Sequence, residues 1–302
     1  MGILAVGSVA LDSVKTPFGQ EEEILGGSAT YFSIAASYFT QVSVVAVVGE
    51  DFPAQHIDFL QKLGIDTAGL EKKPGRTFRW RGEYGDDFNT ARTLDTKLNV
   101  FADFSPRLLR EQRRMEYVFL GNIDPDLQRS VLEQMEKPKL VACDTMNYWI
   151  DNKPESLRKT LSGIDILLMN DAETRQLSKE TNLIRAARAI LGWGPKTLVI
   201  KRGEYGVLMI DQKSAFGAPA FPLEEVVDPT GAGDSFAGGF FGYLAATRSA
   251  DRAALRKAVV FGTVMASFNV SEFGPRRLAC LTYPEVEARY REFRELTFFE
   301  EL

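Results

Sequence analysis

The chain has 302 residues, of which 45% are hydrophobic, and a formal net charge of −5 at neutral pH. This length and apolar content suffice for one large domain with a substantial core. The negative charge argues against nucleic acid or a membrane surface as a partner. The only cysteines, Cys143 and Cys280, exclude a cysteine metal site and suit a reducing compartment. With no leader or membrane-spanning apolar run in sight, we expect a cytoplasmic globular protein.

The first predicted strand is Ile3–Val6, and the chain is expected to stay extended from Val9 to Val14. Asp12 lies in this second segment. Ligands gather at the carboxyl ends of strands in open parallel sheets, and a carboxylate there can accept hydrogen bonds from two sugar hydroxyls. From the sequence alone, Asp12 is either such a ligand or an ordinary turn residue.

A glycine pair, Gly26 and Gly27, precedes a helix predicted from Ala29 to Phe39, with Ser28 as its N-cap. The two glycines allow another molecule to approach the backbone closely. A buried strand is predicted next, at Gln41–Val48, and the single histidine, His56, is expected on the surface of the following helix.

The segment from Lys72 to Val100 has a different character. Polar and apolar residues alternate around Trp80, and Asp86 with Asp87 marks a turn, which predicts a hairpin outside the main sheet. Together with residues of about 13–24 it would form a small β lid. Its aromatic residues serve either as the core of the lid or as a platform for a flat ligand; they are Phe78, Trp80, Tyr84 and Phe88.

From Tyr117 onward, predicted strands alternate with helices, which indicates a parallel sheet with crossover helices. The strand at Ile164–Met169 leads directly into Asn170 and Glu173. These two residues either cap the next helix or help to organise a metal and phosphate.

A strand, a glycine turn and a second strand are predicted between Pro195 and Val207. The turn contains Gly203 and Gly206, and it follows Lys201 and Arg202. The two cations either reach the phosphates of a nucleotide or are solvated turn charges.

The most specific stretch is residues 227–239, which reads VDPTGAGDSFAGG. Gly231 and Gly233 permit a tight turn before a helix predicted at Ser235–Thr247. The first N–H groups of a helix have no intrahelical partner, and the helix dipole adds about half a positive charge there, so the site suits phosphate oxygens. Asp234 is either a helix cap or a base that takes the proton from an attacking hydroxyl.

This stretch resembles the DTxGAGD signature of the ribokinase-like (PfkB) carbohydrate kinase family, with Pro229 where Thr is common. The resemblance implies that Asp234 is the catalytic base and that Gly231, Ala232 and Gly233 form an anion hole. It also implies that Asp228 helps to hold a monovalent cation such as K⁺.

Further positions match the family more weakly along nearly the whole chain. The resemblance implies that Asp12 grips the hydroxyls of the acceptor, that Gly26 and Gly27 contact it, and that Asn170 and Glu173 organise Mg²⁺, with Glu173 acting through water. The positions that it places near the nucleotide are Asn170, Glu173, Lys201, Gly203, Gly206 and Gly274. Pro275 stands where the family has Ala.

The expected fold is a single domain over residues 1–302, a three-layer α/β/α ribokinase-like sandwich with a small β-sheet lid. The expected enzyme uses ATP and Mg²⁺ to phosphorylate a primary hydroxyl of a nucleoside or sugar. It is expected to be a monomer, or a homodimer through the lid.

The acceptor remains open at this stage between a nucleoside and a free sugar, as in ribokinase or fructokinase. The flat side chains of Tyr31, Phe32, Phe78 and Trp80 favour a nucleoside, because stacking a base on an aromatic ring contributes about 1–3 kcal/mol. A non-catalytic sensor that binds a sugar or nucleotide is the alternative from another class, and the presence of Asp234 argues against it.

Overall fold

The computed structural model describes residues 2–88, 90–298 and 300. Its centre is a nine-stranded sheet in the order β13-β12-β11-β10-β9-β8-β1-β4-β5. Neighbouring strands are parallel from β5 to β11, whereas β12 and β13 pair antiparallel at one edge. The strands are β1 (Gly2–Val6), β4 (Gln41–Gly49), β5 (Ile65–Lys73), β8 (Tyr117–Leu120), β9 (Leu140–Asp144), β10 (Ile166–Asn170), β11 (Thr197–Lys201), β12 (Val207–Asp211) and β13 (Ala215–Ala218).

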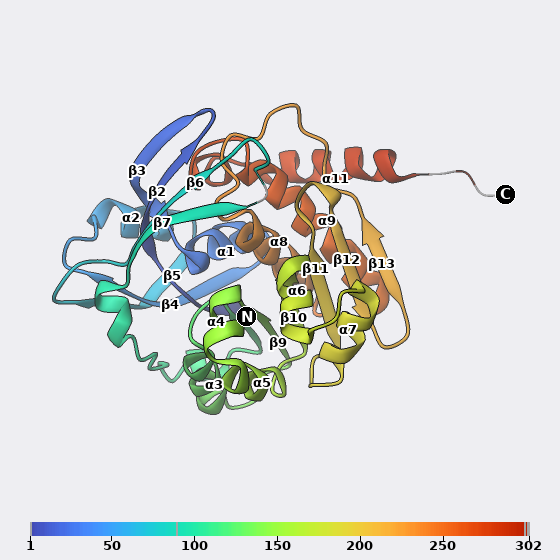
Figure 1. The fold of residues 1–302 in the computed structure, drawn as a ribbon. Helices are drawn as coiled ribbons and strands as arrows, with labels where there is room; N and C mark the ends of the chain where they lie inside the picture. The colour runs from blue at the N-terminus through green and yellow to red at the C-terminus, as the bar shows by residue number, and fades with distance from the viewer. Residues whose placement is uncertain (1, 89, 299, 301–302) are drawn as a thin grey trace.

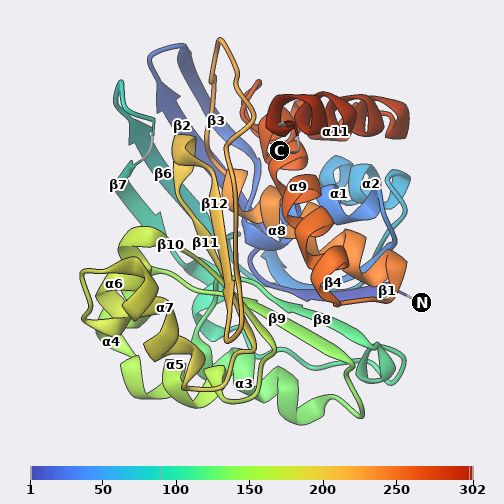
Figure 2. The ribbon, with the colours of Figure 1, turned by 90° about the vertical axis from the view of Figure 1, so that its right-hand side faces the viewer.

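Helices cover both faces of this sheet, as Figure 2 shows. On one face lie α1 (Ser28–Ser37), α2 (Ala54–Lys62), α8 (Ala232–Thr247), α9 (Arg252–Asn269), α10 (Arg276–Ala279) and α11 (Tyr283–Thr297). On the other face lie α3 (Pro125–Gln134), α4 (Asn147–Asn152), α5 (Pro154–Leu161), α6 (Asp171–Ser178) and α7 (Leu183–Leu191). Within the described residues, no helix has both the length and the apolar character needed to cross a membrane.

The central strands are buried on both faces, as β1 illustrates. Leu4 and Val6 pack in the core on the side of α3, α5 and α7, whereas Ile3 and Ala5 pack in the core beneath α8 and α9. Continuous apolar strands of this kind are typical of parallel sheets that lie between two helical layers. The predicted three-layer α/β/α sandwich is therefore confirmed.

A second, four-stranded sheet stands beside the main one (Figure 1), and this confirms the predicted small lid. It consists of β2 (Ala10–Thr16), β3 (Gly19–Gly26), β6 (Arg79–Tyr84) and β7 (Ala91–Lys97), in the order β3-β2-β6-β7. Two antiparallel hairpins meet along the parallel pair of β2 and β6. The predicted lid segment began at Lys72, but β5 of the main sheet extends to Lys73. The second hairpin of the lid begins at Arg79.

The lid is tied to the main body next to α1. Arg79 of β6 forms ion pairs with Asp51, which follows β4, and with Glu23 of β3, at 2.8 and 2.6 Å.

The prediction that Ser28 caps α1 is wrong: α1 begins at Ser28 itself, and Gly27 occupies the N-cap with φ 94°. The hydroxyl of Ser28 instead accepts the N–H of Ser8, which joins α1 to the end of β1.

Candidate active site

The start of α8 is an open set of backbone donors. Gly231 is the N-cap residue with φ 73°, in the left-handed region that favours glycine. In the described part of the chain, nothing accepts a hydrogen bond from the N–H groups of Gly231, Gly233 and Asp234, whereas the N–H of Ala232 donates to Pro229 O at 3.1 Å. Of the three residues predicted to form the anion hole, Gly231 and Gly233 therefore have free N–H groups, whereas the N–H of Ala232 is already engaged. The N–H of Asp234 is free as well.

Asp234 lies in the first turn of α8. Burial raises the pKa of its carboxyl to about 7, the charge of Asp144 adds to this, and the ammonium of Lys201 opposes it. A carboxyl with a pKa near neutrality can take up and release a proton at physiological pH, which is what a general base requires.

Asp12 of β2 is 4% exposed and accepts the N–H of Gly27 through Oδ2 at 3.3 Å. A Cβ atom on Gly26 would lie 1.9 Å from the same oxygen. The glycine pair is therefore required so that β3 can turn into α1 directly over this carboxyl. Burial raises the pKa of Asp12 to about 7, and the charges of Asp228 and Asp234 raise it further, against the effect of the Gly27 N–H.

Tyr31 of α1 links these two parts of the site. Its ring packs against the turn before α8, since a Cβ atom on Gly231 would lie 2.3 Å from the ring. The side chain is buried, and its hydroxyl has no hydrogen-bond partner among the described residues. Burial holds the pKa of this phenol well above its usual range, and the charges of Asp12 and Asp228 add to the effect. The hydroxyl is thus a buried donor without an acceptor among the described residues.

Tyr84 brings the lid to the same place. It ends β6, and its oxygen accepts a hydrogen bond from the hydroxyl of Thr230 at 3.4 Å. Burial raises the pKa of Tyr84, and the charges of Asp228 and Asp12 contribute. The lid therefore contacts the loop that precedes α8.

Asp228 connects two loops. Its Oδ1 accepts the N–H of Thr230 and its Oδ2 accepts the N–H of Gly274, both at 2.9 Å. Gly274 has φ 62°. A Cβ atom on Gly274 would lie 3.0 Å from Cδ1 of Ile24 in the lid. Asn269 donates to Thr230 O through Nδ2, and its Oδ1 is buried with no partner in the described residues.

Asn170 and Glu173 form a complete capping box at the start of α6. Asn170 Oδ1 accepts the N–H of Glu173, and Glu173 Oε2 accepts the N–H of Asn170, both at 2.7 Å. Burial raises the pKa of Glu173 to about 7, while the nearby charge of Lys201 lowers it. The capping geometry is present, and the side chain also faces the cluster around Lys201.

Lys201 ends β11 and forms a 2.7 Å ion pair with Asp144 at the end of β9. Burial disfavours its charge, but Asp144 and Glu173 outweigh that effect, so the pKa of the ammonium lies above its usual range. Of the two alternatives for Lys201, the solvated turn charge is wrong. Arg202, in contrast, is exposed.

The turn after β11 is built around Gly203 and Gly206, with φ 55° and 83°. A Cβ atom on Gly206 would lie 2.1 Å from Ala218 O, so glycine lets this turn lie against the end of β13. Because β9, β10 and β11 are parallel neighbours, the turn lies at the same edge of the sheet as Asp144 and Asn170.

The predicted aromatic surface for a base is wrong for three of its four members. Phe32 is fully buried and stacks on Phe119 with ring centroids 3.7 Å apart, and the ring of Tyr31 packs against Gly231. Phe78 stacks on Phe101 at 5.2 Å and so belongs to a core. Trp80 is half-buried, and its ring lies over Gly82 in the lid.

The sequence analysis gave Asp144 no role, and it named Tyr84 only as one of four aromatic residues of the lid. Asp144 directly follows the apolar residues 140–143, and an acid at the end of such a run is a usable signal. Tyr84 gave no comparable signal, since an alternating lid strand does not show which aromatic residue reaches across to α8.

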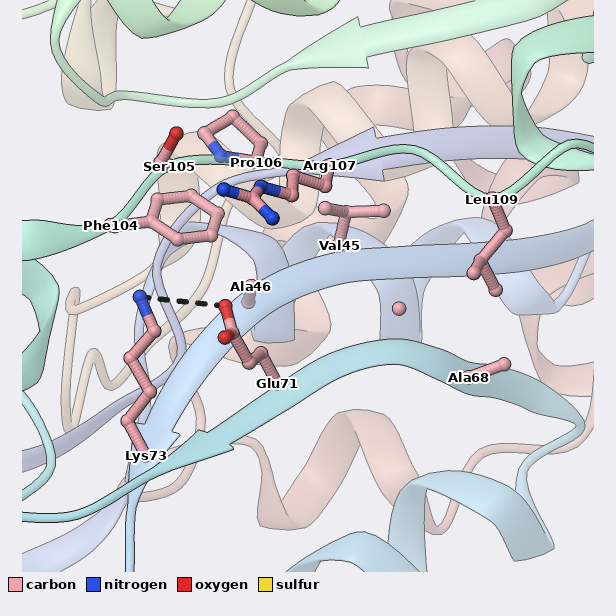
Figure 3. Close-up of a pocket in the computed structure, with 11 residues that line it drawn as sticks. Val45, Ala46, Ala68, Glu71, Lys73, Phe104, Ser105, Pro106, Arg107 and Leu109 are labelled. Atoms are coloured by element: carbon pink, nitrogen blue, oxygen red, sulfur yellow. Dashed lines mark ion pairs between the residues drawn. The ribbon is translucent and has the colours of Figure 1, made fainter.

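A cavity of about 400 Å³ lies elsewhere, between β4, β5 and residues 104–109 (Figure 3). Its wall includes Phe104, Arg107 and the ion pair of Lys73 with Glu71 at 3.5 Å. None of its lining residues belongs to the cluster around α8. The cavity is therefore separate from the candidate active site at α8.

The fold and the cluster together define a kinase that acts on small molecules. The chain belongs to the pfkB family of carbohydrate kinases, whose sequence pattern matches residues 5–280. It is 31% identical over 247 residues to the cytidine kinase of Thermococcus kodakarensis, which covers 80% of this chain and 87% of that protein. It is thus an enzyme of the carbohydrate and nucleoside kinase group.

Solved structures agree with the fold. The nucleoside kinase of Methanocaldococcus jannaschii superposes with a TM-score of 0.78 at 20% identity, covering 97% of this chain and 99% of that one. Ribokinase from Thermotoga maritima gives a TM-score of 0.75 at 22% identity, over 96% and 99% of the two chains. The predicted ribokinase-like fold is confirmed.

The raised pKa of Asp12 predicts a pH-dependent stability. The unfolded chain releases this proton near pH 3.8, whereas the folded chain holds it to about pH 7, so stability falls as the pH rises through this interval. Asp12→Asn keeps an oxygen for Gly27 but cannot ionise. Its free energy of unfolding should exceed that of the wild type by about 2–4 kcal/mol at pH 8 and by less at pH 4. Urea unfolding at both pH values measures this, and an equal difference at both would contradict the assignment.

Proposed function

We propose that the protein transfers the γ-phosphoryl group of ATP to a primary hydroxyl of a nucleoside or sugar. The observation that carries this proposal is the placement of Asp234 beside the open N–H groups of α8. Asp12 is close enough for the charge of Asp234 to raise its pKa. An acid next to an anion-binding helix start supplies the two elements that phosphoryl transfer needs, a base and a set of donors.

Asp12 and the backbone of Gly26 and Gly27 hold the acceptor in this proposal. The carboxyl of Asp12 accepts hydrogen bonds from sugar hydroxyls, and the unpartnered hydroxyl of Tyr31 offers a donor in the same space. A buried donor without a partner costs about 1–3 kcal/mol, and a hydroxylated ligand removes that cost by accepting from it.

Asp234 takes the proton of the attacking hydroxyl, and the N–H groups of Gly231, Gly233 and Asp234 stabilise the charge on the phosphoryl oxygens. When bound, ATP with Mg²⁺ supplies the phosphoryl group and neutralises part of its charge. The side chains fit such a ligand, because Mg²⁺ is usually held by one or two carboxylates, waters and the phosphates themselves. Glu173 contributes a carboxylate through water, with Asn170 beside it.

The remaining nucleotide contacts are assigned to Lys201 and to the turn of Gly203 and Gly206, with Gly274 on the opposite loop. Asp228 is proposed as a ligand of a monovalent cation such as K⁺. Each of its oxygens accepts one hydrogen bond and retains a lone pair, and the unpartnered Oδ1 of Asn269 lies beside the same loop. No step of the mechanism depends on this cation.

The acceptor class that we favour is the nucleoside. The cytidine kinase relative supports it, although three of the four expected stacking side chains pack elsewhere in the protein. Trp80 and Tyr84 of the lid are the flat side chains still placed near an acceptor held by Asp12, since Trp80 pairs with Asp12 across β2 and β6. A free-sugar kinase is the second candidate. We place the enzyme in the cytoplasm, as a monomer or a homodimer through the lid.

A competition among acceptors tests this assignment. Cytidine, adenosine and inosine are incubated with ATP and Mg²⁺ beside ribose, fructose and inositol, and ADP release is measured for each. We expect a nucleoside, with cytidine foremost, to be phosphorylated at least tenfold more efficiently than any free sugar. Efficient turnover of a free sugar without nucleoside turnover would reverse the assignment.

Asp234→Asn should lower kcat by a factor of about 100 or more, because a positioned base contributes about that much. Binding of the acceptor should remain, as measured by calorimetry. Asp251→Asn is the matched control, since Asp251 also stands at a helix start but only caps α9 through the N–H of Ala254. Near wild-type turnover in a folded Asp234→Asn protein would exclude Asp234 as the base.

A further inference from the structure

The ion pair of Lys201 and Asp144 is held in one geometry. Lys201 ends β11, Asp144 ends β9, and the 2.7 Å contact spans the intervening end of β10. The other carboxylate oxygen of Asp144 accepts the N–H of Thr145 at 2.7 Å. With both oxygens engaged and the side chain 5% exposed, Asp144 fixes the position of the ammonium.

This ammonium lies over the first turn of α8. A Cβ atom on Gly233 would lie 3.0 Å from Nζ of Lys201, so glycine at this position makes room for it. An ammonium has three N–H bonds, and Asp144 is its single hydrogen-bond acceptor in the described chain. Two N–H bonds therefore remain for a ligand, next to the free backbone donors of Gly233 and Asp234.

An ion pair that only neutralised two buried charges would not need its ammonium to lie over the first turn of α8. Lys201 is surrounded by three acids, Asp144, Glu173 and Asp234, each of which favours its charged form. It thus brings a permanent positive charge to the helix start that binds phosphate in the proposed reaction. For Asp234 to deprotonate the acceptor there, the transferred phosphoryl group has to lie beside Gly233, and hence beside Lys201.

We propose that Lys201 is a catalytic residue that hydrogen-bonds the non-bridging oxygens of the phosphoryl group during its transfer, and that Asp144 is its positioning residue. This inference rests on the proposed kinase function. In the step, the acceptor oxygen bonds to phosphorus while the bond from phosphorus to the leaving oxygen of ADP breaks, and the acceptor's proton passes to Asp234. Lys201 keeps its protons and offsets charge on the equatorial oxygens.

Three variants separate catalysis from structure: Lys201→Met, Asp144→Asn, and the two combined. Lys201→Met should lower kcat at least 100-fold and also lower Tm, because it leaves Asp144 buried without its partner. Asp144→Asn should lower kcat about tenfold. The double variant should regain most of the lost Tm but none of the lost turnover. Recovery of turnover together with Tm would show that the pair is structural only, and would overturn the proposal.

A binding measurement that needs no turnover completes the test. By calorimetry, Lys201→Met should weaken the affinity for AMP-PNP, which carries a γ-phosphoryl group, at least tenfold and leave ADP affinity unchanged. An equal loss for both nucleotides would contradict a role at the transferred group.

Lys196→Met is the matched control, because Lys196 forms an equally short 2.7 Å pair with Asp165 near the start of the same strand. This variant should behave as the wild type. A wild type that phosphorylates no acceptor would refute the proposed function, while the AMP-PNP comparison would still decide on Lys201.

Discussion

The burial of acids at the start of α8 is the constraint on which the rest of the site depends. Desolvation is the largest influence on the carboxyls of Asp12, Asp228 and Asp234, and it raises the pKa of each. Ionised carboxylates in such surroundings are costly unless donors face them. Gly26, Gly27 and Gly231 leave the space in which backbone and ring atoms approach these acids so closely.

The charge of the cluster is balanced from two sides. On the side of the lid, backbone N–H groups of Gly27, Thr230 and Gly274 bind Asp12 and Asp228. On the side of the main sheet, Lys201 with Asp144 brings a fixed cation to the helix start. In the proposed reaction, the acceptor binds on the first side and the polyphosphate on the second. Asp234 would then act where the two substrates meet.

Much of the fold and of the site was predictable from the sequence, because its signals are local. The alternation of predicted strands with helices indicated the parallel sheet, and residues 227–239 predicted the glycine turn and the helix that follows it. Contacts across the fold were not predictable. From the sequence, Tyr31 was predicted to be a stacking surface for a base. Only the structure shows that its ring packs against Gly231 and that its hydroxyl is buried without a partner among the described residues. Likewise, no sequence pattern predicts that the ammonium of Lys201 reaches the carboxylate of Asp144, two strands away in the sheet.

The dependence of kcat/KM on pH tests the account most directly, because it connects the reaction to the half-buried carboxyl of Asp234. Rates of ATP-dependent phosphorylation of the best acceptor are measured from pH 5 to 9 in the wild type. Since kcat/KM reports groups of the free enzyme, and the pKa of Asp234 is raised to about 7, the account predicts a rise in rate with an apparent pKa near 7. A profile that is flat from pH 5 to 8, as an ordinary exposed aspartate would give, would contradict it.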